Sequence, residues 1–308
     1  LVEKVSKTGG HLASNLGAVE LTMSLHLCLD LPKDKIVWDV GHQSYVHKIL
    51  TGRKDRFDTL RQYGGLSGFP KRRESEYDAF NTGHSSTSIA AAVGLATADE
   101  QTGDGSTIVA VIGDGSMTGG EAFEALNNAS RLKSNLIIIL NDNEMSISRN
   151  VGGMTNYLAS LRSGERYNRT KDEVKETLLG IPGVGEKLIG RISNAMDSLK
   201  EIFVSDGMLF ENMGLTYLGP IDGHNIRQMK RIMTQAKALD RAVLIHVVTK
   251  KGHGYKPAES HPDAFHGVDA FDRKTGKMCE KKGESWSDAF GSWILKKAGE
   301  DPRITAVT

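Results

Sequence analysis

Short apolar runs alternate along the chain with segments that have helical spacing or an Ala-rich composition. Strands are predicted at residues 36–40, 107–112, 136–140 and 242–248. Helices are predicted at residues 89–100, 121–133 and 226–238. Strands that are apolar over their whole length are typical of parallel sheets whose two faces are both covered. The pattern therefore predicts an α/β protein with a mostly parallel sheet and helices on both faces.

Two segments interrupt this alternation. Residues 151–205 are rich in Gly, Ser, Asn and alternating charge and carry no strand signal, so we expect a loosely packed surface insertion there. From about residue 257 the chain is again irregular, which is typical of a linker. Helical spacing resumes at residues 285–299, so the linker is expected to lead into a further helix.

The two ends indicate a piece of a longer protein. There is no initiator Met, and the last residues, ITAVT, stop inside a strand-like run. We therefore expect a fragment that holds one domain over residues 1–285 and the start of a second, truncated α/β domain at residues 286–308.

The charge balance argues against a general affinity for polyanions. Lys plus Arg number 39 and Asp plus Glu number 38, so no net field would attract nucleic acid or an anionic membrane. No apolar run approaches the roughly 20 residues that cross a bilayer, and the first residues lack the apolar core of a signal peptide. Cys28 and Cys279 form no zinc or disulfide pattern, so a soluble, cytoplasmic protein with reduced thiols is expected.

A site for phosphate and metal is indicated where the second predicted strand ends. The strand runs directly into Gly113-Asp114-Gly115, and a helix is expected to start near Gly120. Glycines let the backbone approach a phosphate closely, and a helix start offers unpaired N–H groups. The Asp114 carboxylate is the kind of ligand that Mg²⁺ prefers.

A second oxygen ligand is expected from the next strand, which ends in Asn141-Asp142-Asn143. One helix and one strand separate Asp114 from Asn143, so a right-handed crossover would return both to the same edge of the sheet. A lone GDG is more often an ordinary turn. The copy at residues 103–105 follows a polar run and has no ligand at the corresponding distance, so we assign it to a loop.

Several of the 10 histidines lie beside glycine, and four of them are candidates to present an imidazole to a cleft: His11, His42, His84 and His266. Imidazole suits proton transfer near neutral pH, although each histidine taken singly is more often structural. A structural or surface role is expected for the others, which are His26, His47, His224, His246, His253 and His261.

Longer strings give a specific resemblance. GDGSMTGGEAFEALNNA and ILNDNEMSIS resemble the thiamine-diphosphate enzymes, and within them the 1-deoxy-D-xylulose-5-phosphate synthase family. So do GGHLASNLGAVELT, WDVGHQSYVHKILTGR, GGLSGFPKRRESEYD, TGHSSTSIAAAVGLA, GPIDGHN and TKKGHGYKPAE. The resemblance covers nearly the whole chain and implies a thiamine-diphosphate-binding fold. It also implies that Asp114 and Asn143 bind Mg²⁺ by side chain and that Met145 binds it by its backbone oxygen.

The resemblance implies a reaction that condenses pyruvate with glyceraldehyde 3-phosphate and releases carbon dioxide. His11, His42 and His266 would line the substrate side. The implied cofactor-binding residues are His42, His84, Ser85, Ser86, Gly113, Asp114, Gly115, Ser116, Asn143, Met145 and Lys251. Lys251 would approach the diphosphate, with Lys250 as the alternative.

The family also needs groups that this sequence does not reach. A glutamate that activates the aminopyrimidine ring belongs to the second domain, and the arginines that grip the substrate phosphate lie further on. We therefore expect about half of an active site, in a homodimer whose missing carboxyl-terminal domains complete it. The fragment alone is expected to be inactive.

Three alternatives stay open. The magnesium fingerprint is shared with other transketolase-type thiamine-diphosphate enzymes, although GHQSYVHKILTGR and GGLSGFPKRRESEYD favour the synthase. The fragment could be a structural remnant that only holds a dimer together. Residues 178–190, LLGIPGVGEKLIG, resemble a helix-hairpin-helix element that binds DNA, but a single copy in a nearly neutral chain favours a chance turn.

Overall fold

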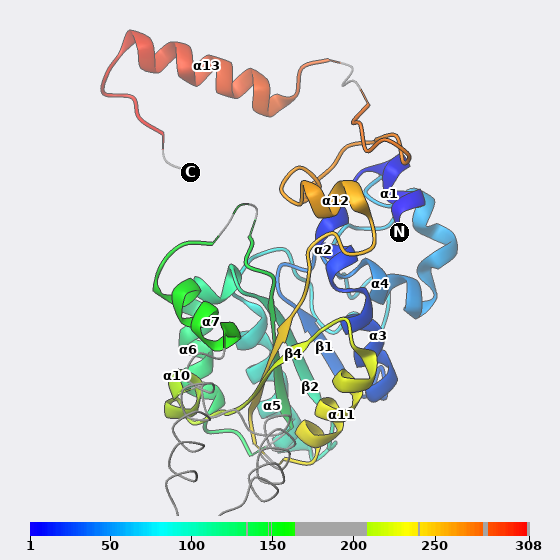
Figure 1. Cartoon of the computed structure of the whole chain (residues 1–308), viewed down its shortest axis with the longest axis vertical. Helices are drawn as coiled ribbons and strands as arrows, with labels where there is room; N and C mark the ends of the chain where they lie inside the picture. The colour runs from blue at the N-terminus through cyan, green and yellow to red at the C-terminus, as the bar shows by residue number, and fades with distance from the viewer. Residues whose placement is uncertain are drawn as a thin grey trace, which may run out of the picture.

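The computed structural model describes residues 1–133, 135–146, 148, 150–163, 208–239, 241–279 and 283–306. At its centre is one sheet of five parallel strands, in the order β1-β2-β3-β5-β4 (Figure 1). The strands are β1 Lys35–Trp38, β2 Ile108–Gly113, β3 Leu136–Asp142, β4 Thr216–Asp222 and β5 Val243–Val248. The four predicted strands and the parallel α/β class are confirmed.

The fifth strand, β4, was not predicted from the sequence. Its interior contains Gly219 and Pro220, and its pairing with β5 is irregular between Leu218 and Ile221. Pro lacks the N–H that a central strand needs, so it is tolerated at an edge. β4 pairs only with β5 and is such an edge strand.

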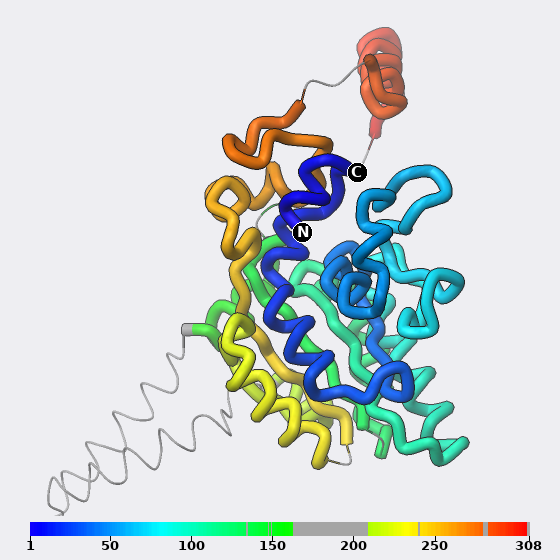
Figure 2. The backbone as a smooth tube through the Cα atoms, turned by 90° about the vertical axis from the view of Figure 1, so that its right-hand side faces the viewer, coloured from blue at the N-terminus to red at the C-terminus, as the bar shows by residue number. Residues whose placement is uncertain are grey.

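Helices cover both faces of the sheet, as Figures 1 and 2 show. On one face, α5 Ser88–Thr102, α6 Gly120–Ala129, α7 Gly153–Ser163 and α10 Met208–Asn212 contribute to a core with Ile138 and Leu140. On the other, α3 Val19–Cys28 and α11 Ile226–Lys237 pack on Ile137 and Ile139. The helices predicted at residues 89–100, 121–133 and 226–238 are confirmed. Neighbouring residues of β3 pack in opposite cores, which is why the strand is apolar from Leu136 to Leu140.

The start of the expected surface insertion belongs to the main core. Leu158 and Leu161 of α7 are 2% and 3% exposed and pack in the first core. The expectation of loose packing over residues 151–205 is therefore wrong for α7. The polar residues that dominate α7 gave no indication of a helix with one buried apolar face. Residues 164–207 lie outside the described residues, and so does the helix-hairpin-helix resemblance at 178–190.

A third core lies beside α1 Val2–Thr8, α2 Leu12–Gly17 and α4 Tyr45–Lys48. It includes Ala258 of α12 Lys256–Ser260 and the side chains of Phe265, Val268 and Phe271, all of which are buried. Figures 1 and 2 show this segment against the amino-terminal helices. The segment from residue 257 to 271 is therefore packed, contrary to the expected linker. Its apolar residues lack regular spacing because they pack as loop residues.

The helix expected at residues 285–299 is confirmed as α13 Trp286–Glu300, which begins with a capping box between Ser285 and Asp288. None of its residues is buried, and Figure 1 shows it apart from the sheet. Within the described part of the chain, no helix is long and apolar enough to cross a membrane.

Candidate active site

A cavity of about 390 Å³ opens where β1, β2 and β3 end. Its lining combines the two loops that follow β2 and β3, the lysine after β5, and the histidines that precede α2, follow β1 and follow α12. The lining residues are His11, Ser14, Asp39, Val40, His42, Gln43, Phe69, Ser85, Gly113, Asp114, Gly115, Ser116, Asn141, Asn143, Met145, Ser146, Lys251 and His266. Segments from most of the described chain thus converge at one sheet edge.

Asp114 and Asn143 follow neighbouring parallel strands, as the sequence predicted. Gly113 pairs with Asn141 at the last register of β2 and β3, and the Asp114 N–H donates to the Asn141 carbonyl at 3.3 Å. Both side chains line the cavity. Gly115 is required for this approach, because a Cβ atom there would lie 2.8 Å from Cβ of Ser146.

Asp114 carries an incompletely paired buried carboxylate. Its Oδ1 atom accepts the Gly115 N–H at 2.9 Å, whereas Oδ2 is buried without a hydrogen-bond partner among the described residues. Burial, and then the neighbouring Asp142 carboxylate, raise the pKa of Asp114 to about 7. A bound cation would offset the buried negative charge of Asp114, so the donor set fits a hard divalent ion.

The charge of Asp142, a neighbour of Asp114, is offset by protein groups. Burial alone would raise its pKa, but the hydrogen bond from His246 Nε2 at 2.9 Å and the cation of Arg162 hold the pKa of Asp142 below its ordinary value. Arg162 also pairs with Glu144 at 2.9 Å. A helix of the expected insertion thus holds the loop that carries Asn143, a contact that sequence reasoning missed.

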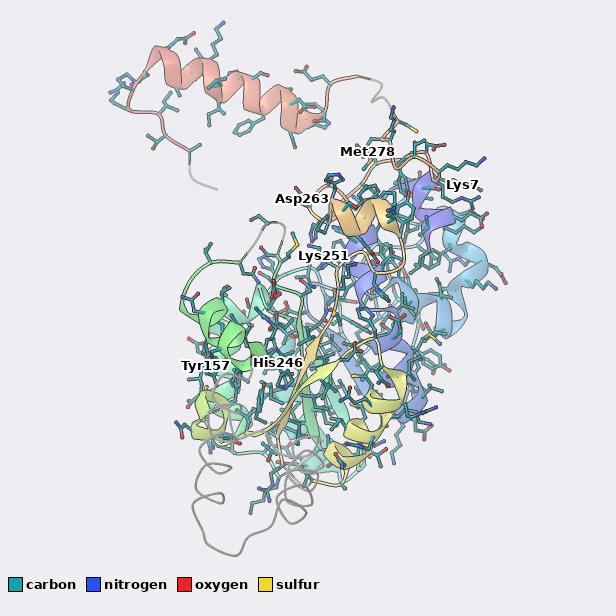
Figure 3. The ribbon with its side chains drawn as sticks, viewed as in Figure 1. Lys7, Tyr157, His246, Lys251, Asp263 and Met278 are labelled. Carbon is teal, nitrogen blue, oxygen red and sulfur yellow. The ribbon has the colours of Figure 1, made fainter. Side chains whose placement is uncertain are left out.

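Of the two neighbouring lysines, the structure brings Lys251 to the cavity. Its side chain is buried, and Nζ donates to the Ser146 carbonyl. Burial lowers the pKa of Lys251 to about 8, so the group is still mostly cationic at neutral pH. Figure 3 shows Lys251 between the end of the sheet and α12. Lys250 instead pairs with Glu259 at 2.6 Å on the surface.

Three histidines form a compact cluster in the lining of the cavity. The ring centroids of His11 and His42 are 5.1 Å apart, those of His11 and His266 are 5.5 Å apart, and those of His42 and His266 are 5.2 Å apart. Burial, and then nearby positive charge, lower the pKa of His11 and of His266 to about 4, and the pKa of His42 falls well below 6.5. All three imidazoles are therefore neutral at pH 7.

His84 lies outside the cavity lining. Its side chain is exposed, whereas the adjacent Ser85 lines the cavity. Ser86 is buried and its hydroxyl donates to the Ser116 carbonyl at 2.7 Å, so it supports the loop after β2 from behind. The histidines expected to be structural, His26, His47, His224, His246, His253 and His261, are all absent from the lining.

Sequence reasoning missed several lining residues, of which Asp39 is the most informative. Its two carboxylate oxygens accept the N–H groups of Ser86 at 2.9 Å and Ser88 at 3.0 Å, which ties the end of β1 to the start of α5. Its place at the carboxyl end of a predicted strand was a signal available in the sequence. Phe69 and Ser14 gave no such signal, because tertiary contacts bring them to the site.

Comparison with known proteins identifies the family of the chain. A sequence profile described as 1-deoxy-D-xylulose-5-phosphate synthase matches residues 1–249. The chain belongs to the 1-deoxy-D-xylulose-5-phosphate synthase family. It is 58% identical over 309 residues to the 1-deoxy-D-xylulose-5-phosphate synthase of Lachnoclostridium phytofermentans, covering 100% of this chain and 49% of that protein. The synthase of Desulforudis audaxviator is 57% identical, with 100% and 48% covered.

The synthase-family chain thus spans about half the length of these relatives. Solved structures show the same fold at lower identity. Transketolase from Leishmania mexicana has a TM-score of 0.61 at 19% identity and covers 98% of this chain and 46% of its own. Transketolase from Campylobacter jejuni has a TM-score of 0.63 at 23% identity, with 88% and 39% covered. A transketolase-like α/β fold agrees with the observed parallel sheet.

Proposed function

We propose that this cavity binds thiamine diphosphate and Mg²⁺ for the reaction of a 1-deoxy-D-xylulose-5-phosphate synthase. That reaction decarboxylates pyruvate and transfers its two-carbon unit to glyceraldehyde 3-phosphate. The observation that carries the proposal is the buried, unpaired Oδ2 of Asp114, which shares the cavity with Asn143 and Lys251. A buried carboxylate oxygen without a donor is costly unless a cation completes it.

Each side of the cavity then has its own task. Asp114 and Asn143 would hold Mg²⁺ by their side chains and Met145 by its backbone oxygen, while Gly113, Gly115 and Ser116 leave room for the diphosphate. Lys251 supplies a cation toward it. When bound, the thiazolium ring supplies the electron sink for the pair left by carbon dioxide. Contacts from His84, Ser85 and Ser86 to the cofactor stay predictions, and the exposed His84 has the least support.

The histidine cluster would handle protons on the substrate side. His266 Nδ1 lies 3.3 Å from the Ser14 hydroxyl, which leaves Nε2 for exchange with substrate. At pH 7 a neutral imidazole can accept a proton, and the imidazolium that it forms, with a pKa of about 4 for His11 and His266, returns the proton readily. His11 and His42 would act beside it.

The proposed domain division would leave this site incomplete. We propose that residues 1–285 form the diphosphate domain and that α13 starts the aminopyrimidine domain. Trp286, Phe290 and Trp293 of α13 are 94%, 59% and 56% exposed, so the helix has an apolar surface for later domains to cover. We further propose a homodimer, and a cytoplasmic location in keeping with the free thiols of Cys28 and Cys279. Without the missing glutamate and arginines, this chain should form no ketose phosphate.

Calorimetric titration of the chain with thiamine diphosphate, with and without Mg²⁺, tests the proposal. We expect magnesium-dependent binding that Lys251→Met weakens about tenfold or more, because a charge-assisted hydrogen bond contributes about 1.5–3 kcal/mol. Lys250→Met is the matched control and should change the affinity less than twofold, since Lys250 does not line the cavity. No binding by the unmodified chain, or equal losses in both variants, would contradict the assignment. Another transketolase-type activity would instead appear as turnover of a sugar phosphate donor by the complete enzyme.

A further inference from the structure

Helix α2 is a short element on which several parts of the site depend, and Asn15 lies at its centre. The helix covers Leu12–Gly17, with His11 at its N-cap, and Asn15 is fully buried. Asn15 does not line the cavity. Its side chain is therefore a buried polar group without direct access to a bound molecule.

The Asn15 amide joins the segments that carry His11 and His42. Its Nδ2 atom donates to the His11 carbonyl at 2.6 Å and to the His42 carbonyl at 2.7 Å. Its Oδ1 atom accepts the backbone N–H of Tyr45 at 2.7 Å. The Tyr45 hydroxyl in turn accepts the His11 N–H at 3.2 Å, which closes a second connection between the two segments.

The chemistry of this position requires an amide. Asn offers two donors and one acceptor in a plane, and here all of them face backbone groups of opposite character. Asp would have the same shape, but it would turn both donors into acceptors and direct them at two carbonyl oxygens. Ala would leave those groups buried without partners, which costs about 1–3 kcal/mol each.

We propose that Asn15 is a positioning residue that holds His11 and His42 in ring contact across the cavity. Its catalytic meaning rests on the proposed function, because the histidines matter to turnover only if the cavity performs that reaction. The positioning itself rests on geometry alone. The two carbonyls it binds belong to the same residues whose rings lie 5.1 Å apart.

Histidine-detected NMR of the complete 308-residue chain tests this assignment. The unmodified chain should show a nuclear Overhauser effect between the His11 and His42 rings. Asn15→Asp should reduce this effect several-fold. In Asn15→Ala, which adds no charge, the pKa of His11 should rise by about one unit or more toward 6.5, a tenfold change in its proton affinity, as the rings separate and water enters. The charges that face His11, Arg61 and Lys251, are the same in all variants.

A control separates positioning from general stability. Leu126→Ala opens a cavity in the core on the far side of the sheet. It should lower the melting temperature at least as much as the Asn15 variants do, while leaving the ring contact between His11 and His42 and the His11 pKa intact. The ring resonances of His246, buried in β5, serve as an internal reference. An unchanged ring contact and unchanged His11 pKa in both Asn15 variants would overturn the proposal, as would the same changes in Leu126→Ala.

The same samples distinguish this inference from the proposed function. If the unmodified chain fails to bind thiamine diphosphate and Mg²⁺ while the Asn15 variants lose the ring contact, the proposed function fails and the positioning role stands. If the chain binds the cofactor and the variants keep the ring contact, the positioning role alone is overturned.

Discussion

Replacing Asp114 by Asn should stabilise the metal-free chain at neutral and alkaline pH, although the same change should abolish magnesium binding. The substitution keeps the size of a side chain that is 3% exposed and removes its charge. In the metal-free state that charge is buried beside Asp142 and has no partner at Oδ2 within the described structure. Asp114, which we assign to the metal, therefore lowers the free energy of unfolding when no metal is bound.

The size of the effect follows from the pKa of Asp114. A rise from 3.8 to about 7 is a shift of about three units, and at about 1.4 kcal/mol per unit it limits the effect to about 4 kcal/mol. Below pH 3.8 the carboxyl is protonated in both states and costs nothing. Between pH 3.8 and 7 the unfolded chain ionises while the folded chain keeps its proton, so wild-type stability falls relative to the variant. Above pH 7 the difference is constant.

Urea unfolding of both proteins in EDTA, from pH 4 to pH 8, measures this difference. We expect Asp114→Asn to match the wild type at pH 4 and to exceed its free energy of unfolding by about 2–4 kcal/mol at pH 8. The buried histidines titrate in both proteins and cancel in the comparison. Mg²⁺ with thiamine diphosphate at 1,000 times the Kd should cancel or reverse this difference, because the ligand stabilises only the wild type, by about 4.1 kcal/mol. A variant that is less stable at pH 8, or a difference independent of pH, would refute the reasoning.

Two further predictions concern α7. Arg162→Met should weaken the affinity for Mn²⁺, used as a paramagnetic substitute for Mg²⁺, about three- to tenfold, because the loop that contains Glu144 loses its ion pair. Arg131→Met, an exposed control, should leave the affinity unchanged. Leu158→Ala should lower the free energy of unfolding by about 2–5 kcal/mol, whereas the exposed Asn156→Ala should change it by no more than about 0.5 kcal/mol. Equal effects of Leu158→Ala and Asn156→Ala in urea titrations would show that α7 is not part of the core.

The metal side of the site could be predicted because its determinants are local. Strand β2 and residues 136–140 of β3 are apolar, so the ends of both runs are visible in the sequence, and parallel pairing places Asp114 and Asn143 at one edge of the sheet. The same reasoning assigned the second GDG, around Asp104, to a loop and not to the metal site. It follows α5, whose C-cap is Gly103, and it does not line the cavity.

The remaining features depend on contacts that sequence patterns do not carry. The strand β4 contains Pro220 and is revealed only by its pairing with β5. Phe265 and Phe271 follow no periodicity, because they pack on amino-terminal helices from a loop. The polar face of α7 matched the composition of a surface loop, although Leu158 fills the main core. In each case a non-local partner decides the structure, and single-sequence reasoning has no access to it.

Strand pairing positions one part of the cavity and non-local packing positions the other, so the two parts should differ in their sensitivity to mutation. The metal side rests on the central strands, whose backbone pairing fixes Asp114 and Asn143 directly. The histidine side rests on α2, where Ala13 donates its N–H to the Phe265 carbonyl and accepts the Gly252 N–H, both at 2.9 Å.

The position of α2 depends on close packing against neighbouring backbone. A Cβ atom on Gly17 would lie 3.0 Å from the Lys250 carbonyl oxygen, so a larger residue at position 17 would force the backbone at Lys250 to shift by a few tenths of an ångström. A six-residue helix is too short to be stable by itself, so its place depends on these tertiary contacts. Substitutions in the packed segment at residues 257–271 should therefore displace His266 directly and His11 through α2, while leaving the metal ligands in place. The two halves of the chemistry can thus be separated by mutation within one domain.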